Sequence, residues 1–298
     1  MALGPEPADW AAAAVTDGGG VVVAVDDAPD ALFWVRPGSY DVLGKVLAAA
    51  PSLRWVQLPF AGVEGVPLDG DHTWTCAKGV YAEPVAEHAM ALALAGLRGL
   101  PARARATSWG EQSAQTLYDA PVVVLGGGGI TAALIALLAP YRASVTVVRR
   151  DAGTPVDGAA RTVGLEQLDE VLPGARVVVL ALALTPETEG VIGARQLELM
   201  DADAWLVNVA RGRHVDQAAL VQALQARSIG GAALDVTDPE PLPADSPLWT
   251  LPNCLVTPHT ANPGELSRPL LAAQVTENVR RFGAGEELLG LVDPAAGY

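Results

Sequence analysis

The sequence predicts an α/β protein of two domains that contains a doubly wound parallel sheet. Short apolar runs of the strand type alternate with helical patterns along most of the chain. A glycine-rich loop joins one such strand to an apolar helix. The chain has 298 residues, 50% of them hydrophobic, which is enough for more than one core. Alternation on this scale is typical of parallel sheets covered by helices on both faces.

The N-terminal part is predicted to be a small α/β unit. Pro and Gly turns separate its apolar runs, as expected between short strands. The strands are expected at 21–25, 31–35, 53–58 and 72–76, with one helix near 40–50.

A helical pattern begins at Glu83 and predicts a helix that crosses from this unit to the next. A βαβ unit typical of dinucleotide binding then follows. Its strands are expected at 121–125 and 144–148, around a tight loop at 126–130 and a helix at 131–139. Further strands are expected within 176–184, 204–210, 230–236 and 253–258, with a helix at 216–227 capped by Asp216 and a last helix at 267–282.

The net charge of −15 argues against nucleic acid or an anionic membrane as a partner, because both would be repelled. The start of the sequence lacks the charged and apolar regions of a signal peptide, and the apolar run at 89–97 is too short to span a bilayer. The only cysteines, Cys76 and Cys254, have no metal-ligand spacing. We therefore expect no metal site and a cytoplasmic location.

Three residues at strand ends carry the prediction of chemistry. Arg211, Glu240 and His259 each follow an apolar run by a few residues, so three strands would bring them to one sheet edge. An arginine can bind a carboxylate bidentately, and a histidine paired with a carboxylate can protonate a carbonyl oxygen. These groups suit 2-oxo acid reduction. A structural ion pair is the alternative for Arg211 and Glu240, and Asp238 is a close rival to Glu240.

These segments resemble the D-isomer-specific 2-hydroxyacid dehydrogenases, since the Gly-rich loop, LTPET, NVARG, LDVTDPEPLP and TPHTA follow the family's order. The resemblance implies two doubly wound domains. A Rossmann cofactor domain would span 92–267, and a smaller flavodoxin-like substrate domain would combine 1–91 with 268–298.

The resemblance also implies roles, a reaction and a homodimer. Arg211 would bind the carboxylate and polarise the carbonyl, His259 would donate the proton, and Glu240 would be its partner. Hydride would pass between NADP(H) and a small 2-oxo acid or D-2-hydroxy acid. Glyoxylate, hydroxypyruvate, pyruvate and bulkier acids all stay open as substrates. The alternative is a catalytically silent NADP-binding sensor or corepressor.

The glycine-rich loop predicts the pyrophosphate site. Gly126 and Gly128 take the first two glycine positions of the dinucleotide pattern, and Gly129 and Ile130 complete the loop. Thr131 stands at the third glycine position, which implies looser helix packing or a different loop.

Arg149 and Arg150 end the next strand, where NAD-specific relatives carry an acid. Guanidinium groups can bind a 2′-phosphate, so NADP(H) is predicted in preference to NAD(H), which stays open as a second cofactor. Surface pairing with Asp151 or Asp157 is the alternative for these arginines. Thr188, Val209 and Asp235 match further cofactor contacts of the family, Asp235 at the nicotinamide carboxamide.

Two N-terminal loops resemble the substrate loops of the family. They supply Phe60, Ala61, Gly62 and Gly79 as candidate substrate contacts, although Cys76 stands where relatives often have Asn. The remaining histidines receive structural interpretations. We expect His72 in a turn, His88 as a packing residue of the crossing helix and His214 in an exposed loop.

Overall fold

The computed structural model describes residues 1–36, 38–68, 70–110 and 112–294. Its contacts divide the chain into two compact units. Unit 1 combines residues 1–81 with 263–298, and unit 2 spans 82–262. Both contain parallel sheets, one of four strands and one of seven, so the predicted α/β fold is confirmed.

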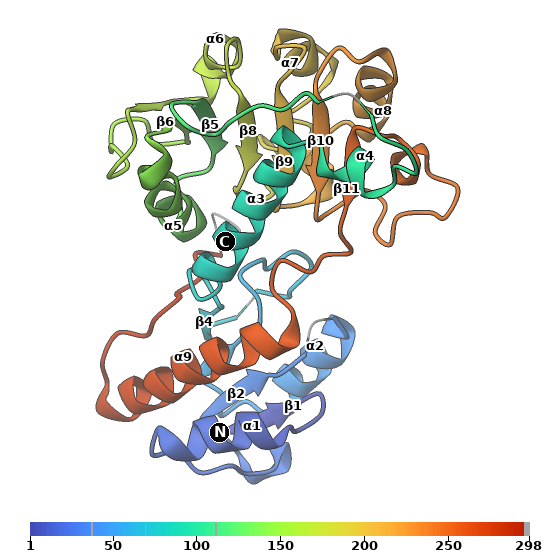
Figure 1. The fold of residues 1–298 in the computed structure, drawn as a ribbon. Coiled ribbons are helices and arrows are strands. Elements are labelled where there is room, and N and C mark those ends of the chain that lie inside the picture. The colour runs from blue at the N-terminus through green and yellow to red at the C-terminus, as the bar shows by residue number, and fades with distance from the viewer. Residues whose placement is uncertain (37, 69, 111, 295–298) are drawn as a thin grey trace. The chain divides into compact units, whose positions relative to one another are not determined.

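Unit 1 is a four-stranded parallel sheet in the order β1-β2-β3-β4. The C-terminal helix α9 returns to this unit and packs against α1 (Figure 1). Three tryptophans, Trp34, Trp55 and Trp74, are among its largest fully buried side chains. Its elements are β1 (Ala2–Gly4), α1 (Asp9–Asp17), β2 (Ala31–Trp34), α2 (Tyr40–Ala49), β3 (Trp55–Gln57), β4 (Thr73–Thr75) and α9 (Gly264–Ala284).

The prediction of a strand at residues 21–25 is wrong. The segment is irregular and ends in a short 3-10 turn at Val25–Asp27. Val21 is 70% exposed, so the apolar run is not buried as a sheet strand would be. Its backbone bonds the chain start, where the Val23 N–H donates to the carbonyl of Met1.

Unit 2 is a seven-stranded parallel sheet in the order β11-β10-β9-β8-β5-β6-β7. The order reverses at β5, so β5 and β8 flank the topological switch point where such sheets bind ligands. Its elements are α3 (Ala82–Leu97), α4 (Leu100–Ala104), β5 (Pro121–Leu125), α5 (Gly129–Leu138), β6 (Ser144–Val148), β7 (Arg161–Val163), α6 (Leu168–Val171), β8 (Val177–Leu180), α7 (Ala194–Leu199), β9 (Trp205–Asn208), α8 (Gln217–Ala226), β10 (Gly231–Leu234) and β11 (Cys254–Val256).

Helices cover the sheet of unit 2 as a doubly wound fold requires. On one face α3 packs against α5, β9 and β10 (Figure 1). A Cβ on Gly96 would collide with the ring of Trp205, so this glycine lets α3 lie close to the sheet. Val178 of β8 and Leu206 of β9 belong to one hydrophobic cluster with Leu168, Leu197 and Leu220, which lie on α6, α7 and α8. The buried strands therefore read as continuous apolar runs.

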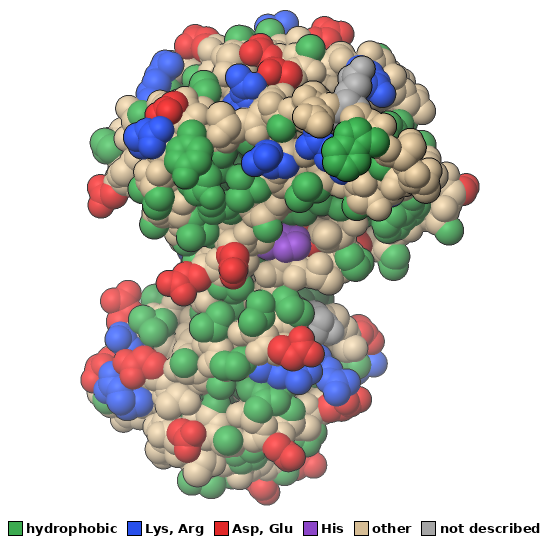
Figure 2. Space-filling model, in the orientation of Figure 1, with side chains coloured by type: hydrophobic (Ala, Val, Ile, Leu, Met, Phe, Trp, Pro, Cys, Tyr) green, Lys and Arg blue, Asp and Glu red, His purple; other side chains and the backbone are tan. Residues whose placement is uncertain are grey.

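Among the described residues, no helix combines the length and apolar character needed to cross a membrane. On the face shown in Figure 2, acidic and basic side chains are interspersed with hydrophobic ones. The same described part of the chain contains no cluster of three or more His, Cys, Asp or Glu side chains that could hold a metal ion.

Candidate functional site

The three candidate chemical residues lie at one edge of the unit 2 sheet. Arg211 follows β9, Glu240 lies in the loop after β10, and His259 follows β11. These strands are parallel neighbours, so their carboxyl ends share the edge at which the glycine-rich loop also follows β5. The side chains of Glu240 and His259 meet there, with Oε1 and Nδ1 2.6 Å apart. The N–H of its rival Asp238 donates instead to the side chain of Gln217, so the pairing favours Glu240.

The geometry defines the tautomer of His259. An ionised Glu240 only accepts hydrogen bonds, so Nδ1 of His259 carries a proton and donates it to the carboxylate. The other ring nitrogen, Nε2, is left for a reacting group. About half of the His259 side chain, 53%, is exposed, which keeps it accessible.

His259 adopts a left-handed backbone conformation with φ of +51°. Such a conformation is uncommon for a residue with a side chain and persists when surrounding bonds enforce it. Asp235 supplies those bonds. Its carbonyl accepts from the N–H of His259 at 2.8 Å, and its carboxylate accepts from the N–H groups of Thr260 and Ala261 at 2.8 and 2.9 Å.

Asp235 is only 1% exposed and still ionised. Burial alone would raise its pKa, but hydrogen bonds from His88, Thr257 and the N–H groups of Thr260 and Ala261 outweigh burial and lower the pKa to about 2. Most of the hydrogen bonds that the Asp235 carboxylate accepts therefore come from the turn that carries His259. Its carboxylate is also the group that the sequence prediction placed at the nicotinamide carboxamide.

Arg211 is held by a turn after β9. The Asn208 amide donates to the carbonyl of Arg211 at 2.8 Å, and Asn208 Oδ1 accepts from the N–H of Ala210 at 3.0 Å. A Cβ on Gly212 would collide with the backbone of Thr237, so the turn lies directly against the loop after β10. The side chain of Arg211 donates to the carbonyl of Ala210 at 2.8 Å.

His214 is buried, and the prediction of an exposed loop histidine is wrong. It is 0% exposed, and its Nδ1 lies 3.2 Å from the N–H of Arg211. Its Nε2 lies 3.3 Å from the carbonyl of Ala183. The ring thus ties the Arg211 turn to the loop after β8. The run of charged neighbours around His214 hid this role from sequence reasoning.

The glycine-rich loop has the shape that a dinucleotide pyrophosphate requires. Gly126 has φ of +110°, and a Cβ there would collide with the carbonyl of Ala181. A Cβ on Gly128 would meet nothing within 4 Å, so the backbone is open to a ligand at this position. Helix α5 begins at Gly129, so the N–H groups of its first turn, including that of Ile130, are available to an anion at this loop.

Thr131 explains how the loop tolerates the missing third glycine. Its side chain is fully buried, and its hydroxyl donates to the carbonyl of Gly126 at 2.8 Å. The hydroxyl closes the loop on itself, so the departure from the glycine pattern is a different way to fix the same turn.

Arg149 and Arg150 follow β6, the neighbour of β5, so they lie at the same sheet edge as this loop. The methylene chain of Arg149 packs over Gly127, and its guanidinium donates to the carbonyl of Thr154 at 3.4 Å. The pKa of Glu187 is lowered, chiefly by a hydrogen bond from Thr185 and also by the charge of Arg150. Arg150 is therefore close to the loop that follows β8.

Two other predicted cofactor residues are fixed within unit 2. The Thr188 hydroxyl donates to the carbonyl of Ala183 and accepts from the N–H of Thr185, both at 2.8 Å, so it closes its own loop. Val209 is buried with 8% exposure, and its N–H donates to the carbonyl of Leu180.

The candidate substrate residues lie at the carboxyl edge of the unit 1 sheet. Phe60, Ala61 and Gly62 follow β3, and Gly79 follows β4. The carbonyl of Phe60 accepts from the N–H of Ala77, which joins the two loops. Gly79 has φ of +80°, and a Cβ there would meet nothing within 4 Å. Phe60 is 40% exposed, which favours a surface role over core packing.

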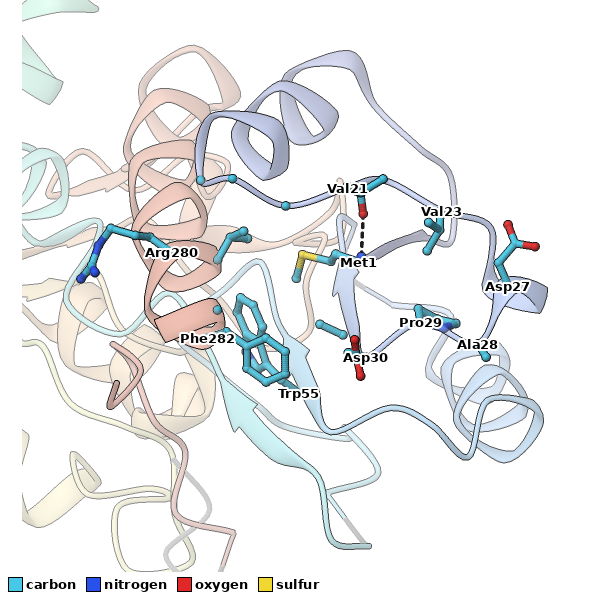
Figure 3. Close-up of a pocket in the computed structure, with 16 residues that line it drawn as sticks. Met1, Val21, Val23, Asp27, Ala28, Pro29, Asp30, Trp55, Arg280 and Phe282 are labelled. Atoms are coloured by element: carbon cyan, nitrogen blue, oxygen red, sulfur yellow. Dashed lines mark hydrogen bonds between the residues drawn. The ribbon is translucent and has the colours of Figure 1, made fainter. Parts of the chain in front are cut away.

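A cavity of about 410 Å³ lies at the opposite edge of unit 1, around the amino ends of β1, β2 and β3. In Figure 3 the Met1 amine bonds the carbonyl of Val21, and the rings of Trp55 and Phe282 stand together. The side chain of Arg280 points away from the cavity. The described lining residues include none of the predicted site residues.

Comparisons with known proteins point to one family. The family model for the NAD binding domain of D-isomer specific 2-hydroxyacid dehydrogenases matches residues 88–261. An uncharacterized protein of the proB 3′ region of Corynebacterium melassecola is 38% identical over 295 residues, which cover 96% of this chain and 95% of that protein.

Two solved structures show the same architecture over the whole chain. A D-isomer specific 2-hydroxyacid dehydrogenase from Xanthobacter autotrophicus Py2, in complex with NADPH and MES, is 32% identical with a TM-score of 0.85, covering 100% of this chain and 98% of its own. An NADPH-dependent glyoxylate/hydroxypyruvate reductase from Sinorhizobium meliloti, in complex with NADP and sulfate, is 25% identical with a TM-score of 0.84, covering 100% of this chain and 99% of its own.

Proposed function

Because the chain belongs to the D-isomer-specific 2-hydroxyacid dehydrogenase family, we propose that it is an NADPH-preferring reductase of small 2-oxo acids. The observation that carries the proposal is the short hydrogen bond between Glu240 and His259 on the sheet edge that also presents Arg211. This combination supplies an anion-binding fork and a proton donor with a fixed tautomer. The product is the D-2-hydroxy acid.

Each residue has a chemical role in the proposal. Arg211 binds the substrate carboxylate and stabilises the charge that develops on the carbonyl oxygen. His259 gives the proton on Nε2 to that oxygen, while Glu240 stabilises the imidazolium through Nδ1. The backbone of Ala61, Gly62 and the Gly79 loop supplies further donors to the carboxylate.

Unit 2 is proposed as the cofactor domain and unit 1 as the substrate domain. The open backbone at Gly128 and the first turn of α5 would hold the pyrophosphate, and Asp235 would accept from the carboxamide. The reduced nicotinamide supplies the hydride when it is bound. Two free, buried thiols, Cys76 and Cys254, fit a reducing cytoplasm.

The NADPH preference rests on the arginine pair beside the glycine-rich loop. Replacing Arg149 and Arg150 together by Ala is expected to weaken NADPH binding about a hundredfold, because two charge-assisted contacts to the 2′-phosphate are lost. NADH binding should change less than about threefold. Fluorescence titration with both cofactors measures the difference. Arg142→Ala, which breaks a surface pair with Asp119, is the matched control, and equal losses for both cofactors would remove the 2′-phosphate assignment.

The reaction itself is tested by the loss of NADPH absorbance with a panel of 2-oxo acids, with NADH in parallel. Turnover supports the reductase, and the best acid identifies the substrate class. Tight NADPH binding without turnover on any acid would instead favour an NADP-binding sensor or corepressor. The intact Glu240–His259 pair favours the enzyme over that alternative.

We also propose that the protein is a homodimer formed through exposed apolar side chains of unit 2. Hydrophobic side chains gather over α5 in Figure 2, and Leu137 of this helix is 37% exposed. Leu100 of α4 and Trp109 in the segment after it are 52% and 93% exposed. Apolar patches of this kind mark protein interfaces.

Replacing Leu100 and Trp109 together by Glu is expected to weaken the dimer at least about thirtyfold, because two charges would be buried without partners. Sedimentation equilibrium measures the shift toward monomer. Leu266→Glu, at a leucine of unit 1 that is 50% exposed, is the matched control. A wild-type protein that sediments as a monomer would contradict the proposal.

A further inference from the structure

His88 lies beside the turn that carries His259 and has polar partners that its sequence context did not indicate. It belongs to α3, and its Nε2 lies 3.3 Å from Asp235 Oδ1 and 3.2 Å from Thr257 Oγ1. The side chain of His88 is 22% exposed, and that of Asp235 is 1% exposed. A packing residue would require no such contacts.

The carboxylate of Asp235 connects α3 to this turn. Its Oδ1 accepts from the hydroxyl of Thr257 at 2.6 Å and from the N–H of Thr260 at 2.8 Å. Its Oδ2 accepts from the N–H of Ala261 at 2.9 Å. His88 approaches Oδ1 from the helix side, so one carboxylate joins a rigid helix to three groups of the turn.

The direction of these bonds follows from the charges. The pKa of Asp235 is lowered to about 2, so the carboxylate is ionised and only accepts. Nε2 of His88 must then carry its proton and donate toward Asp235 and the Thr257 oxygen. A donor that approaches a buried carboxylate from a helix holds it in one orientation, and the N–H groups of the turn follow that orientation.

The backbone conformation of His259 depends on the hydrogen bonds of this turn. Its φ of +51° is a conformation that a side chain disfavours, and a relaxed turn would lose it. Loss of the turn would move the imidazole away from Glu240, whose Oε1 lies 2.6 Å from Nδ1. A displacement of about 1 Å in a catalytic group can cost a hundredfold in rate.

We propose that His88 is a positioning residue for His259, which holds the turn of residues 257–261 through Asp235. The inference rests on the proposed reductase function, because only a proton donor needs this placement. His88 contacts neither substrate nor cofactor in this role. It contacts the carboxylate of Asp235, which accepts from the N–H groups of the turn that carries His259.

Three variants test the inference. His88→Leu removes the donor while keeping bulk, His88→Gln keeps an amide donor, and Thr257→Val removes the hydroxyl on the same carboxylate oxygen. Glu87→Gln, at an exposed neighbour on α3, is the matched control. Hydrogen exchange of the peptide that spans 257–262 is measured on the full protein without substrate. The single-turnover rate of NADPH oxidation and the dissociation constant of NADPH are measured beside it.

His88→Leu is expected to speed exchange at Thr260 and Ala261 about tenfold and to slow the single-turnover rate about tenfold. The dissociation constant of NADPH should change by a smaller factor than the rate, because the glycine-rich loop is untouched and only the proposed Asp235 contact to the carboxamide lies near the change. His88→Gln should return both readouts to within about threefold of wild type, and Thr257→Val should resemble His88→Leu.

Unchanged exchange in His88→Leu would overturn the inference, as would a Gln variant that behaves like Leu. An equal effect of Glu87→Gln would also overturn it, since the cause would then be the helix. If His88→Leu does not fold, the Gln and Thr257→Val variants decide between the outcomes. Absence of turnover in the wild-type protein would remove the proposed function, whereas the exchange data would still report whether His88 holds the turn.

Discussion

Replacing Arg211 by Gln is expected to lower kcat/KM about a thousandfold for every 2-oxo acid that the protein reduces. The charge and the second donor of the fork are both lost, so the carboxylate binds weakly and the developing oxyanion loses its stabilisation. Steady-state kinetics with NADPH measure the change. Both kcat and KM should be affected, because Arg211 contributes to substrate binding and to the chemical step. Arg211→Lys should recover only part of the loss, because an ammonium group cannot bind bidentately.

Arg213→Gln is the matched control for this experiment. Arg213 lies two residues further along the same turn, and its guanidinium pairs with Glu189 at an exposed site. Exposed pairs contribute little to stability, so this variant should keep nearly full activity. An Arg211→Gln protein that retained its kcat/KM would exclude Arg211 from the carboxylate site, and equal losses in both variants would point to damage of the turn.

The strands of unit 2 were predictable because their side chains are buried on both faces. Runs such as that of 121–125 are apolar throughout, and β5 spans the predicted residues Pro121–Leu125. The parallel order then follows from alternation with helices. The Asp216 cap of α8 was also predicted and is confirmed, since its carboxylate accepts from the N–H of Ala219 at 3.0 Å.

The sequence did not reveal the elements whose formation depends on tertiary contacts. Helix α1 was not predicted, because its alanine run has no pronounced amphipathic pattern and is stabilised by packing on α9. The apolar run at 21–25 had the composition of a strand, yet it lies exposed beside the chain start. Composition alone cannot distinguish these cases, since both segments are short and apolar.

The pairing in the candidate site was predictable and its supports were not. The spacing of Glu240 and His259 after adjacent strands predicted their proximity. His88 and His214 act through contacts with residues far along the chain, at Asp235 and Ala183 respectively. No local pattern marks such partners. A histidine in a helix of apolar neighbours therefore looks like a packing residue until the fold places a carboxylate beside it.

Replacing His259 by Asn is expected to lower kcat at least about a hundredfold while NADPH binding changes less than about threefold, because the amide cannot donate a proton to the carbonyl oxygen. Stopped-flow absorbance and fluorescence titration measure the two quantities. Glu240→Gln should cause a smaller loss, since the proton donor stays while its partner at 2.6 Å loses its charge. His72→Asn, at a histidine of unit 1, is the control for loss of an imidazole. If turnover survived in His259→Asn, another group would be the proton donor. If NADPH binding fell in parallel with kcat, the role of His259 would be in cofactor binding and not in proton transfer.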